Sequence, residues 1–328
     1  MPVRYLITGG SGFIGSHLAD ALLARGDEVL VLDDLSTGRL DNLAGALTSD
    51  RCTFVQGSVL DELAVDKAVS SCDVVVHLAA AVGVKLIVEQ RLSSLVTNIR
   101  GSENVIEAAH RYRRKILLAS TSEIYGKNPA SPLAETSDSV LGSPTVARWA
   151  YSTAKAVYEI LAYAYHEERG LPTVVVRLFN TVGPRQCPAY GMVIPRLVRQ
   201  ALTGAPLSVY GDGTQTRCFC HVADVVTALV ALLDRDEAVG EVFNVGATEE
   251  VSMATLAERI IAACESPSSV ELVPYEQAYE RGFEDMARRV PDTAKLHALC
   301  GWVPHRTLAD ILREMIDEAA LEVVPDRG

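Results

Sequence analysis

The segment RYLITGGSGFIGSHL, residues 4–18, decides the fold. It places a short apolar run, RYLIT, directly before Gly9, Gly12 and Gly15, and a helix-forming stretch directly after them. At such a strand-to-helix junction, the missing side chains let a pyrophosphate approach backbone amides at the positive end of the helix. A tight turn without a ligand would use glycines too, so the spacing alone does not identify the ligand.

An acidic pair further along the chain narrows the choice. The second apolar run, EVLVLDD, ends in Asp33 and Asp34, eighteen residues after Gly15. A carboxylate at this place can accept hydrogen bonds from the ribose hydroxyls of adenosine. It would repel a ribose phosphate by about 4 kcal/mol at about 4 Å and an effective dielectric constant of about 20. The sequence therefore predicts NAD rather than NADP, and nearby Arg39 is the residue that argues the other way.

Short apolar runs rich in Val, Ile and Leu recur along the chain. They are RYLIT, EVLVLDD, CTFVQG, VVVHLAA, KILLAST, TVVVRLF and EVFNVG. Runs that are apolar without alternation are typical of strands buried on both faces of a parallel sheet. One stretch between them, residues 150–170, has apolar residues at helical spacing and ends at Gly170, a suitable C-terminal cap. The pattern predicts an α/β protein with a Rossmann-type doubly wound parallel sheet.

The second half of the chain is less regular. After Asn180, Gly and Pro interrupt the segments GPRQCPAYG and VYGDGTQTR, before the helical stretch ADVVTALVALL and one more strand resume the alternation. We expect a smaller C-terminal substrate-binding lobe. The expected boundaries are 1–180, with 218–245 returning to it, for an NAD-binding Rossmann domain, and 181–217 with 246–328 for the lobe.

Composition bounds the class of protein. A length of 328 residues corresponds to about two domains. Hydrophobic residues at 48% and charged residues at 22% exclude disordered and fibrous chains. A net charge of −12 argues against binding to nucleic acid or to an anionic membrane surface, although clustered arginines can still bind a small anion.

Cysteine usage and the N-terminus bear on the compartment. Seven cysteines are scattered without a CxxC pair or a spacing suited to zinc, so we expect reduced thiols, a cytoplasmic protein and no metal. The chain starts without a basic segment and an apolar run, and it holds no uninterrupted apolar stretch of about 20 residues. We therefore expect neither export nor a membrane span.

Several motifs in order resemble the extended short-chain dehydrogenase/reductase superfamily. They are TGGSGFIG at 8–15, HLAA at 77–80, STSEIYG at 120–126, YSTAK at 151–155 and RLFNTVGPR at 177–185. The resemblance covers essentially the whole chain. One departure is the serine at position 58, where many members have an aspartate that contacts adenine.

The resemblance implies a set of residues that bind NAD. It comprises Gly9, Gly12, Phe13, Ile14, Gly15, Asp33, Asp34, Ser36, Thr37, Gly38, Ser58, Val59, Leu78, Ala79, Ala80, Asn98, Tyr151 and Lys155. These positions follow the glycine loop and the carboxyl ends of the predicted strands. The departure at Ser58 is expected to weaken one hydrogen bond without changing the cofactor.

Tyr151 and Lys155 form a candidate catalytic pair. They are four residues apart and therefore share a helix face. A phenol with a solution pKa of about 10 is a poor base at neutral pH, but an adjacent ammonium and a positive nicotinamide ring both favour phenolate. Tyr151 can then take a hydroxyl proton while hydride leaves to NAD. By resemblance, Thr121 polarises the same substrate oxygen, and Lys155 also holds the nicotinamide ribose.

The subfamilies that this chain most resembles act on nucleotide-diphosphate sugars, and three reactions remain open. The dTDP-glucose 4,6-dehydratases use an Asp-Glu pair where this chain has Ser122 and Glu123. GDP-mannose dehydratases do carry Thr-Ser-Glu, so STSEIYG does not exclude dehydration. A 4-epimerase needs only the triad and room for the keto sugar to turn, and it usually lacks a glutamate here.

The third reaction is decarboxylation, because a ketone at C4 makes glucuronate a β-keto acid. UDP-xylose synthases and the decarboxylase half of the bacterial polymyxin-resistance enzyme carry Thr-Ser-Glu, plus an arginine shortly before a proline near the C-terminus. AYERGFEDMARRVPDTAKLHALCGW, at 278–302, resembles that segment and places Arg289 two residues before Pro291, and RWAYSTAK resembles the same enzyme. We assign Glu123, Ser122 and Arg289 to decarboxylation and proton delivery.

The predicted function is NAD-dependent decarboxylation of UDP-glucuronate through a 4-keto intermediate, giving UDP-xylose, UDP-4-keto-pentose or both. UDP-glucuronate 4-epimerase is the first alternative and NDP-hexose 4,6-dehydratase the second. An NAD-sensing or scaffold protein could keep the glycine loop, but it would have no reason to keep Tyr151, Lys155 and Thr121 together.

By resemblance, the UDP-sugar is held by a further set of residues. We expect Arg217 at the diphosphate, Tyr210 near uracil, Asn180 at diphosphate or sugar, Met192, Val193 and Arg196 in the pocket, and Arg185 and Arg289 on the anionic sugar. A guanidinium binds phosphate through two hydrogen bonds, which explains how an acidic protein captures an anion. Packing within the lobe is the alternative role for each of them.

The resemblance also implies a homodimer. The helices expected around 95–110 and 151–168 resemble the pair through which this superfamily forms a four-helix interface. The alternative is that their apolar faces are used entirely within the monomer.

Overall fold

The computed structural model describes residues 2–83, 90–187, 192–278, 286 and 288–323. Its centre is a seven-stranded sheet in the order β11-β6-β5-β4-β1-β2-β3, in which every neighbouring pair is parallel. The strands are β1 (Arg4–Thr8), β2 (Glu28–Asp33), β3 (Cys52–Gln56), β4 (Val74–His77), β5 (Lys115–Thr121), β6 (Thr173–Leu178) and β11 (Glu241–Val245). All seven come from the predicted apolar runs, so the predicted fold class is confirmed.

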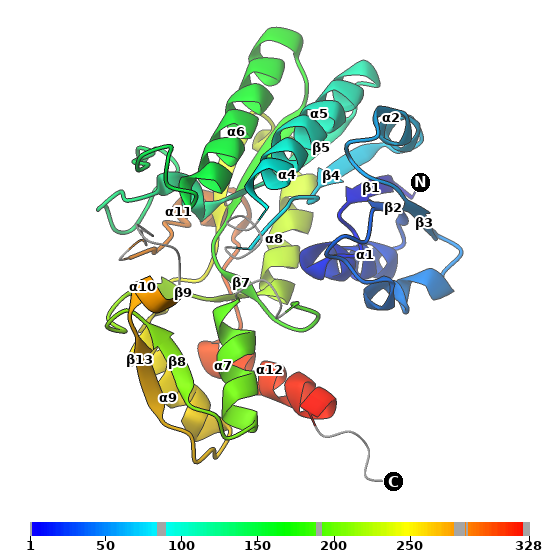
Figure 1. The fold of residues 1–328 in the computed structure, drawn as a ribbon. Helices are drawn as coiled ribbons and strands as arrows, with labels where there is room; N and C mark the ends of the chain where they lie inside the picture. Colours follow the sequence, from blue (N-terminus) through cyan, green and yellow to red (C-terminus); the bar gives the residue numbers. More distant parts are fainter. Residues whose placement is uncertain (1, 84–89, 188–191, 279–285, 287, 324–328) are drawn as a thin grey trace.

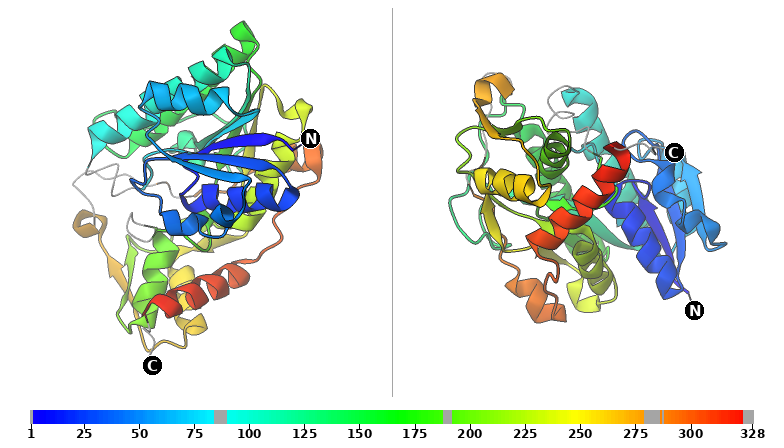
Figure 2. Two further views of the ribbon diagram at one scale, coloured as in Figure 1. Left: turned by 90° about the vertical axis from the view of Figure 1, so that its right-hand side faces the viewer. Right: turned by 90° about the horizontal axis from the view of Figure 1, so that it is seen from below.

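Helices cover both faces of this sheet (Figure 1, Figure 2). One face carries α1 (Phe13–Arg25), α8 (Val222–Leu233) and α11 (Ala294–Cys300); the other carries α2 (Glu62–Ser70), α5 (Ser102–Arg111) and α6 (Trp149–Arg169). Successive strand residues alternate between the two cores: Tyr5 and Ile7 pack with α1 and α8, and Leu6 with α2 and α5. Such two-sided burial explains why the runs are apolar without alternation.

Short elements connect the main ones. They are α4 (Arg91–Val96), the π-helical turn η3 (Thr97–Gly101), and the 3-10 turns η1 (Leu40–Leu43), η2 (Ala46–Thr48), η4 (Ser122–Tyr125) and η6 (Asp236–Ala238). The turn η4 follows β5 directly, so it presents its residues at the carboxyl edge of the sheet. Within the described part of the chain, none of the helices combines the length and apolar character needed to cross a bilayer.

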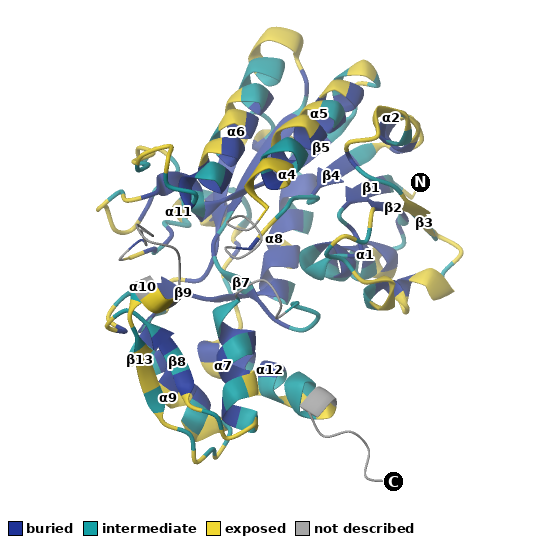
Figure 3. Cartoon of the chain, viewed as in Figure 1, coloured by how far each residue is buried: buried dark blue, intermediate teal, exposed yellow. Residues whose placement is uncertain are grey.

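A smaller group of elements lies beyond the carboxyl edge of the sheet (Figure 1). It contains α7 (Val193–Leu202), β8 (Leu207–Tyr210), β9 (Thr216–Cys218), β12 (Glu250–Ser252), α9 (Met253–Ala263), β13 (Val270–Val273), α10 (Tyr275–Ala278) and α12 (Leu308–Val323). Leu197, Leu256 and Ile311 belong to its separate hydrophobic core. Figure 3 colours stretches of α7, β8 and α9 as buried. The pair β7 (Thr181–Val182) and β10 (Cys220–His221) lies between this group and the sheet.

The long helix α6 ends as predicted. Gly170 has φ 68° and its amide donates to the His166 carbonyl oxygen at 2.9 Å. A residue with a Cβ atom would be strained in this left-handed conformation, so glycine stops the helix and turns the chain toward β6. Pro172 follows before the strand and accepts at its carbonyl from the Ile116 amide at 2.9 Å.

A buried ion pair holds α6 on the sheet. Arg177 of β6 donates to the Glu159 carboxylate of α6 at 2.8 Å, and both side chains are at most one-tenth exposed. Another guanidinium nitrogen of Arg177 donates to the Tyr125 hydroxyl of η4 at 2.9 Å. Burial lowers the pKa of Arg177, but Glu159 outweighs burial and raises it overall. The guanidinium thus fixes three elements that end or begin at the same edge of the sheet.

Arg177→Met should destabilise the protein, because it leaves the buried Glu159 carboxylate without this counterion. We expect the free energy of unfolding, measured by urea titration with circular dichroism, to fall by about 3–5 kcal/mol. The double variant Arg177→Met/Glu159→Leu should recover most of that loss, since neither charge then remains buried. A single variant as stable as the parent would contradict this role for the ion pair.

Candidate active site

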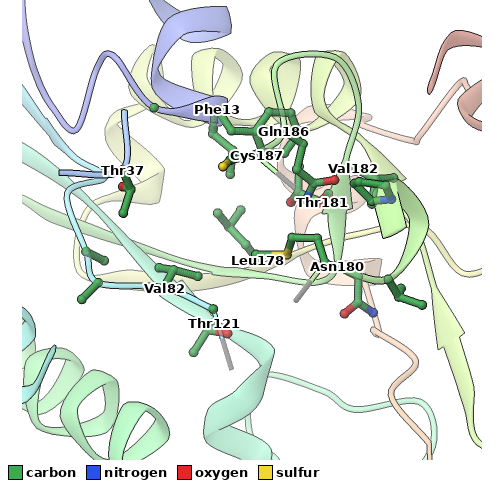
Figure 4. Close-up of a pocket in the computed structure, with 18 of the residues that line it drawn as sticks. Phe13, Thr37, Val82, Thr121, Leu178, Asn180, Thr181, Val182, Gln186 and Cys187 are labelled. Atoms are coloured by element: carbon green, nitrogen blue, oxygen red, sulfur yellow. Dashed lines mark hydrogen bonds between the residues drawn. The ribbon is translucent and has the colours of Figure 1, made fainter. Parts of the chain in front are cut away.

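A cleft of about 1440 Å³ lies between the carboxyl edge of the sheet and the smaller group of elements. Figure 4 draws Thr37 from the segment after β2, Phe13 from α1, Thr121 from the end of β5 and Asn180 from the segment after β6 around one open space. Parallel strands place their carboxyl ends together, so residues far apart in the sequence converge here.

The glycine loop forms one end of the cleft. Gly9 has φ 71°, and its carbonyl oxygen accepts from the Gly12 amide at 3.1 Å. A Cβ atom on Gly15 would collide with the Gly9 carbonyl oxygen and lie 2.7 Å from the Gly10 Cα atom. These glycines therefore let the loop close tightly on the first turn of α1, which leaves backbone amides at the helix start exposed to the cleft. The arrangement fits a dinucleotide pyrophosphate.

Asp33 stands at the end of β2 and organises the next loop. Its two carboxylate oxygens accept from the Ser11 amide at 2.9 Å and the Leu35 amide at 2.8 Å. Burial raises the pKa of Asp33, although these two backbone donors oppose the rise. Arg39 lines the same end of the cleft, is about two-thirds exposed and pairs with Asp41 at 3.4 Å. The Asp33 carboxylate is thus buried at this end of the cleft, whereas the Arg39 side chain is mostly exposed to solvent.

Most predicted NAD-binding residues line the cleft. They are Gly9, Gly12, Phe13, Ile14, Gly15, Asp33, Asp34, Ser36, Thr37, Val59, Leu78, Ala79, Ala80, Tyr151 and Lys155. The other three predicted residues, Gly38, Ser58 and Asn98, are not among the lining residues, and their contacts with NAD stay predictions. The Ser58 hydroxyl accepts from the Leu60 amide within its own turn. The buried Asn98 amide binds both backbone groups of Ala81, so it supports the wall of the cleft from behind.

Gly38 lies close to the cofactor end without lining it. A Cβ atom there would lie 3.1 Å from both Asp33 carboxylate oxygens. The absence of a side chain therefore lets the segment after β2 pass directly over the Asp33 carboxylate.

Thr121, Tyr151 and Lys155 converge in the middle of the cleft. Tyr151 is hydrogen-bonded to Thr121, whose hydroxyl also accepts from the Glu123 amide at 3.2 Å. Lys155 donates to the Ala119 carbonyl oxygen at 2.7 Å and lies over the Tyr158 ring, 4.5 Å from its centroid. The sequence-based grouping of these three residues agrees with the geometry.

Burial dominates the titration of Tyr151 and Lys155. Burial raises the pKa of Tyr151 well above its usual value, the Glu123 charge raises it further, and the Thr121 hydrogen bond only partly offsets both. Tyr151 is therefore a neutral phenol here. Burial lowers the pKa of Lys155 to about 8, because the Glu159 carboxylate opposes burial only in part. Formation of phenolate thus depends on positive charge that arrives with the cofactor.

Glu123 lies between two arginines. Arg148 binds it through two nitrogens, one donating to Oε1 at 2.8 Å and the other to Oε2, and Arg289 donates to Oε1 at 3.1 Å. The exposed fractions are 5% for Arg148, 8% for Arg289 and 14% for Glu123. Burial raises the pKa of Glu123, but the two guanidiniums outweigh it and lower the pKa to about 2. Glu123 is therefore an anion at neutral pH, and its part in decarboxylation and proton delivery stays a prediction.

Arg289 reaches this place because its own backbone is held. The Leu133 amide donates to the Val290 carbonyl oxygen, and the Asp292 amide to the Leu133 carbonyl oxygen, both at 2.8 Å. The Asn244 side-chain amide donates to the Asp292 carbonyl oxygen at 3.1 Å and accepts from the Tyr125 hydroxyl at 2.7 Å. The second guanidinium branch of Arg289 donates to Asn180 Oδ1 at 2.9 Å.

In the predicted C-terminal segment 278–302, residues 279–285 and 287 lie outside the described residues, whereas Arg289 is described and stands at Glu123. Sequence reasoning missed Arg148 as a site residue. Its signal was its place three residues before Tyr151 in RWAYSTAK, but nothing in the sequence predicts its contact with Glu123.

The predicted nucleotide-binding residues Met192, Val193, Arg196, Tyr210 and Arg217 all line the far end of the cleft. The Arg196 guanidinium lies 4.3 Å from the centroid of the Tyr210 ring and donates to the Ser208 carbonyl oxygen at 2.7 Å. The aromatic ring and the guanidinium thus form one wall of this end.

Arg185 does not join the Glu123 cluster. Its side chain pairs with Asp20 of α1 at 2.8 Å, and its amide donates to Glu318 of α12 at 2.8 Å. Arg185 thus connects α1 to α12 at the edge of the cleft, and its contact with an anionic sugar stays a prediction.

Comparison with known proteins agrees with this geometry. The model of the NAD dependent epimerase/dehydratase family matches residues 5–246. The chain is 40% identical over 320 residues to the UDP-N-acetyl-alpha-D-glucosaminuronate decarboxylase of Bacillus cytotoxicus, covering 96% of this chain and 97% of that protein. It is 34% identical over 316 residues to UDP-glucuronic acid decarboxylase 1 of Arabidopsis thaliana, covering 96% and 69%.

A solved structure is similar throughout. The UDP-glucuronic acid 4-epimerase of Bacillus cereus, in complex with UDP-glucuronic acid and NAD, is 28% identical with a TM-score of 0.87, covering 97% of this chain and 99% of that one. The chain therefore belongs to the NAD dependent epimerase/dehydratase family, and its cofactor is NAD.

Asp33→Ser should shift the cofactor preference. Losing a charged hydrogen-bond acceptor should weaken NAD binding about tenfold or more, while NADP binding should improve because the repulsion disappears and Arg39 is nearby. Isothermal titration with both cofactors measures the ratio. Asp50→Ser, at an exposed acidic residue, is the control and should leave it unchanged. An unchanged ratio in Asp33→Ser would contradict this role of Asp33.

Proposed function

We propose that this chain decarboxylates UDP-glucuronate through a 4-keto intermediate, giving UDP-xylose, UDP-4-keto-pentose or both. The observation that carries the proposal is the ionised Glu123, held by Arg148 and Arg289 next to Thr121 and Tyr151. The similarity to decarboxylases of two UDP-uronic acids supports it.

The chain's own groups fit the two stages of this reaction. Bound NAD supplies the acceptor for the hydride from C4 of the sugar. Tyr151 and Thr121 are placed to take the proton of the 4-hydroxyl group and to hold the resulting carbonyl oxygen. Loss of carbon dioxide from C5 then leaves an electron pair that spreads onto the same oxygen as an enolate, which the Tyr151 and Thr121 hydroxyls can stabilise. Addition of a proton at C5 restores the ketone.

Charges at the other end of the sugar fit a carboxylate. Arg289 donates to Asn180 and Glu123 inside the cleft. A sugar whose C4 atom lies at Tyr151 would therefore direct its C6 carboxylate toward the Arg289 guanidinium. Ser122, which is buried in the chain between Thr121 and Glu123, stays assigned to proton delivery together with Arg289. In this proposal Glu123 orients the guanidiniums as an anion.

The alternatives fit less well. A 4-epimerase needs the triad and space, and nothing in that reaction calls for a buried carboxylate between two arginines. A 4,6-dehydratase needs an acid to release water, but position 122 is a serine and Glu123 is ionised. Both reactions share the oxidation step, so the fold itself does not separate them from decarboxylation.

One similarity favours a second substrate. The relative at 40% identity is named for UDP-N-acetyl-glucosaminuronate, which carries an acetamido group on the sugar in addition to the uronic carboxylate. The Arg289 and Tyr151 arrangement addresses the carboxylate and the 4-hydroxyl group, which both substrates share. We therefore propose UDP-N-acetyl-glucosaminuronate as the second candidate.

Incubation with NAD and each UDP-uronic acid, followed by mass spectrometry and proton NMR, tests the function. Loss of carbon dioxide establishes decarboxylation, and the ratio of rates identifies the substrate. Unchanged mass with inversion at C4 would replace the proposal with epimerisation. No reaction with either UDP-uronic acid, but loss of water from an NDP-hexose, would replace it with dehydration.

Glu123→Gln should lower the rate of carbon dioxide release roughly 100-fold or more, because the carboxylate that orients the Arg148 guanidinium in the site is lost. NAD affinity should stay within about twofold, since Glu123 is remote from the glycine loop. The measurement is carbon dioxide release under single-turnover conditions, alongside NAD titration. A variant with parental release would contradict the proposed role.

We also propose a homodimer formed through the helices α4, α5 and α6. Leu92 is 77% exposed and Ile160 is 67% exposed, and α6 contacts both α4 and α5. Figure 3 shows exposed stretches on the outer side of these helices. An unpartnered apolar surface of this kind fits a symmetric contact with a second copy.

Ile160→Glu should weaken that dimer, because it would place a charge in a desolvated interface. Light scattering after gel filtration should give twice the chain mass for the parent and a shift toward the monomer for the variant. Leu63→Glu, at a leucine on α2 that is 83% exposed, is the control and should stay dimeric. A monomeric parent would overturn the proposal.

Two further proposals complete the description. The domain division at 1–180 with 218–245, and at 181–217 with 246–328, is supported by the separate hydrophobic core of the smaller group. Leu296 and Trp302 pack in a core of the sheet instead, so we propose that the segment with α11 belongs to the first domain. A reducing cytoplasmic location is supported by the seven free cysteines, of which Cys72, Cys218 and Cys220 are buried.

A further inference from the structure

The two arginines at Glu123 are bound to it unequally. Arg148 uses both of its terminal nitrogens on Glu123, one on each carboxylate oxygen, which is the bidentate geometry of the strongest guanidinium pairs. Arg289 gives Glu123 a single hydrogen bond, at 3.1 Å, and gives its other branch to Asn180. The contact with Arg289 is therefore the weaker one and the easier to exchange.

The position of Arg148 makes it a fixed partner. It stands at the N-terminal end of α6, two residues before Ala150 and three before Tyr151, and it is 5% exposed. Glu123 lies in the turn η4 that follows β5, so the pair connects this turn to the start of the catalytic helix. The Arg177 and Glu159 pair separately joins α6 to β6, and Arg177 also binds Tyr125 of η4.

Arg289 arrives from a different part of the chain. It belongs to the segment that the Leu133 backbone and the Asn244 side chain hold in place, and it lines the cleft. Its guanidinium can therefore face a ligand while its backbone stays fixed. A uronic carboxylate is chemically the same acceptor as the Glu123 carboxylate that it now contacts.

We propose that Arg148 is the residue that makes the site selective for uronic acids. It serves as the permanent counterion of Glu123. The substrate carboxylate can then replace Glu123 on Arg289, because Glu123 still has a counterion when a second anion lies beside it. This inference rests on the proposed decarboxylation of a UDP-uronic acid and names the residue that sets its substrate class.

The charges explain why the exchange needs Arg148. Two carboxylates close together in a buried site repel each other, and removing one partner of a buried ion pair is costly. With Arg148 present, Glu123 and the substrate carboxylate have one guanidinium each. Without Arg148, Glu123 would hold Arg289 for itself, and an arriving carboxylate would meet the unmatched charge of Glu123.

The test compares a charged with an uncharged UDP-sugar, and variants that remove one charge with a variant that removes both. Binding of UDP-glucuronate and of uncharged UDP-glucose is measured by calorimetry on protein loaded with NADH, which cannot oxidise either sugar. We expect Arg148→Gln to lower UDP-glucuronate affinity at least about tenfold and to leave UDP-glucose affinity within about twofold.

The double variant Glu123→Gln/Arg148→Gln removes both charges, so that the Glu123 carboxylate no longer competes with the substrate for Arg289. It should recover UDP-glucuronate affinity to within about threefold of the parent, while turnover stays low because Glu123 is absent. A merely structural role for Arg148 predicts no recovery, and both sugars would then lose affinity alike. Either of those results would overturn the inference.

Two more variants keep the test decisive if Arg148→Gln does not fold. Glu123→Gln alone leaves both arginines and should bind UDP-glucuronate at least as tightly as the parent, so that a loss of affinity would count against the proposal. Arg288→Gln is the matched control, because Arg288 adjoins Arg289 but pairs with Glu250 at the surface. It should keep the parental preference.

Failure of the proposed function gives a different signature. A parent protein that releases no carbon dioxide and binds both UDP-sugars equally would refute the function itself. A parent protein that decarboxylates UDP-glucuronate, with Arg148→Gln retaining its preference for the uronic acid, would refute only the inference about Arg148.

Discussion

A buried guanidinium, Arg177, sets the geometry on which the cleft depends. A charge that is nearly excluded from water stabilises a fold only when its donors all meet acceptors, and Arg177 finds them on Glu159, on Tyr125 and on the Glu135 carbonyl oxygen. The Tyr125 hydroxyl donates in turn to Asn244, whose side-chain amide binds the segment that carries Arg289. The helix with the catalytic tyrosine, the turn with the acidic residue and the C-terminal segment are therefore positioned by one continuous set of hydrogen bonds.

The same burial sets the protonation of the site in opposite directions. Tyr151 stays a phenol because desolvation and the neighbouring anion both disfavour phenolate, whereas Glu123 stays an anion because two guanidiniums outweigh desolvation. Lys155, with its pKa lowered to about 8, is sensitive to charge nearby. A ligand that brings positive charge toward Tyr151 favours the phenolate there, against the desolvation and the Glu123 charge that now disfavour it.

The sequence predicts what local patterns encode. Continuous apolar runs identify all seven strands, the four-residue spacing places Tyr151 and Lys155 on one helix face, and Gly170 marks where that helix stops. Contacts between distant segments are harder to predict, because they depend on how the elements pack. Arg148 binds Glu123, which lies 25 positions earlier in the chain. Arg185 pairs with Asp20, and Ser58 and Asn98 bind backbone atoms. No sequence motif indicates these contacts.

The fold alone does not determine which reaction of this family the protein catalyses, because a 4-epimerase has a similar fold, with a TM-score of 0.87. All of these reactions begin with a ketone at C4, and they diverge in what the protein does to C5 and C6 afterwards. A neutral wall lets the keto sugar turn, and a protonated acid removes a hydroxyl group. An ionised carboxylate between two guanidiniums does neither of these, but it does offer a place for a second carboxylate. In the proposed function, the choice of reaction therefore follows from the charges of Glu123, Arg148 and Arg289 at one end of a shared cleft.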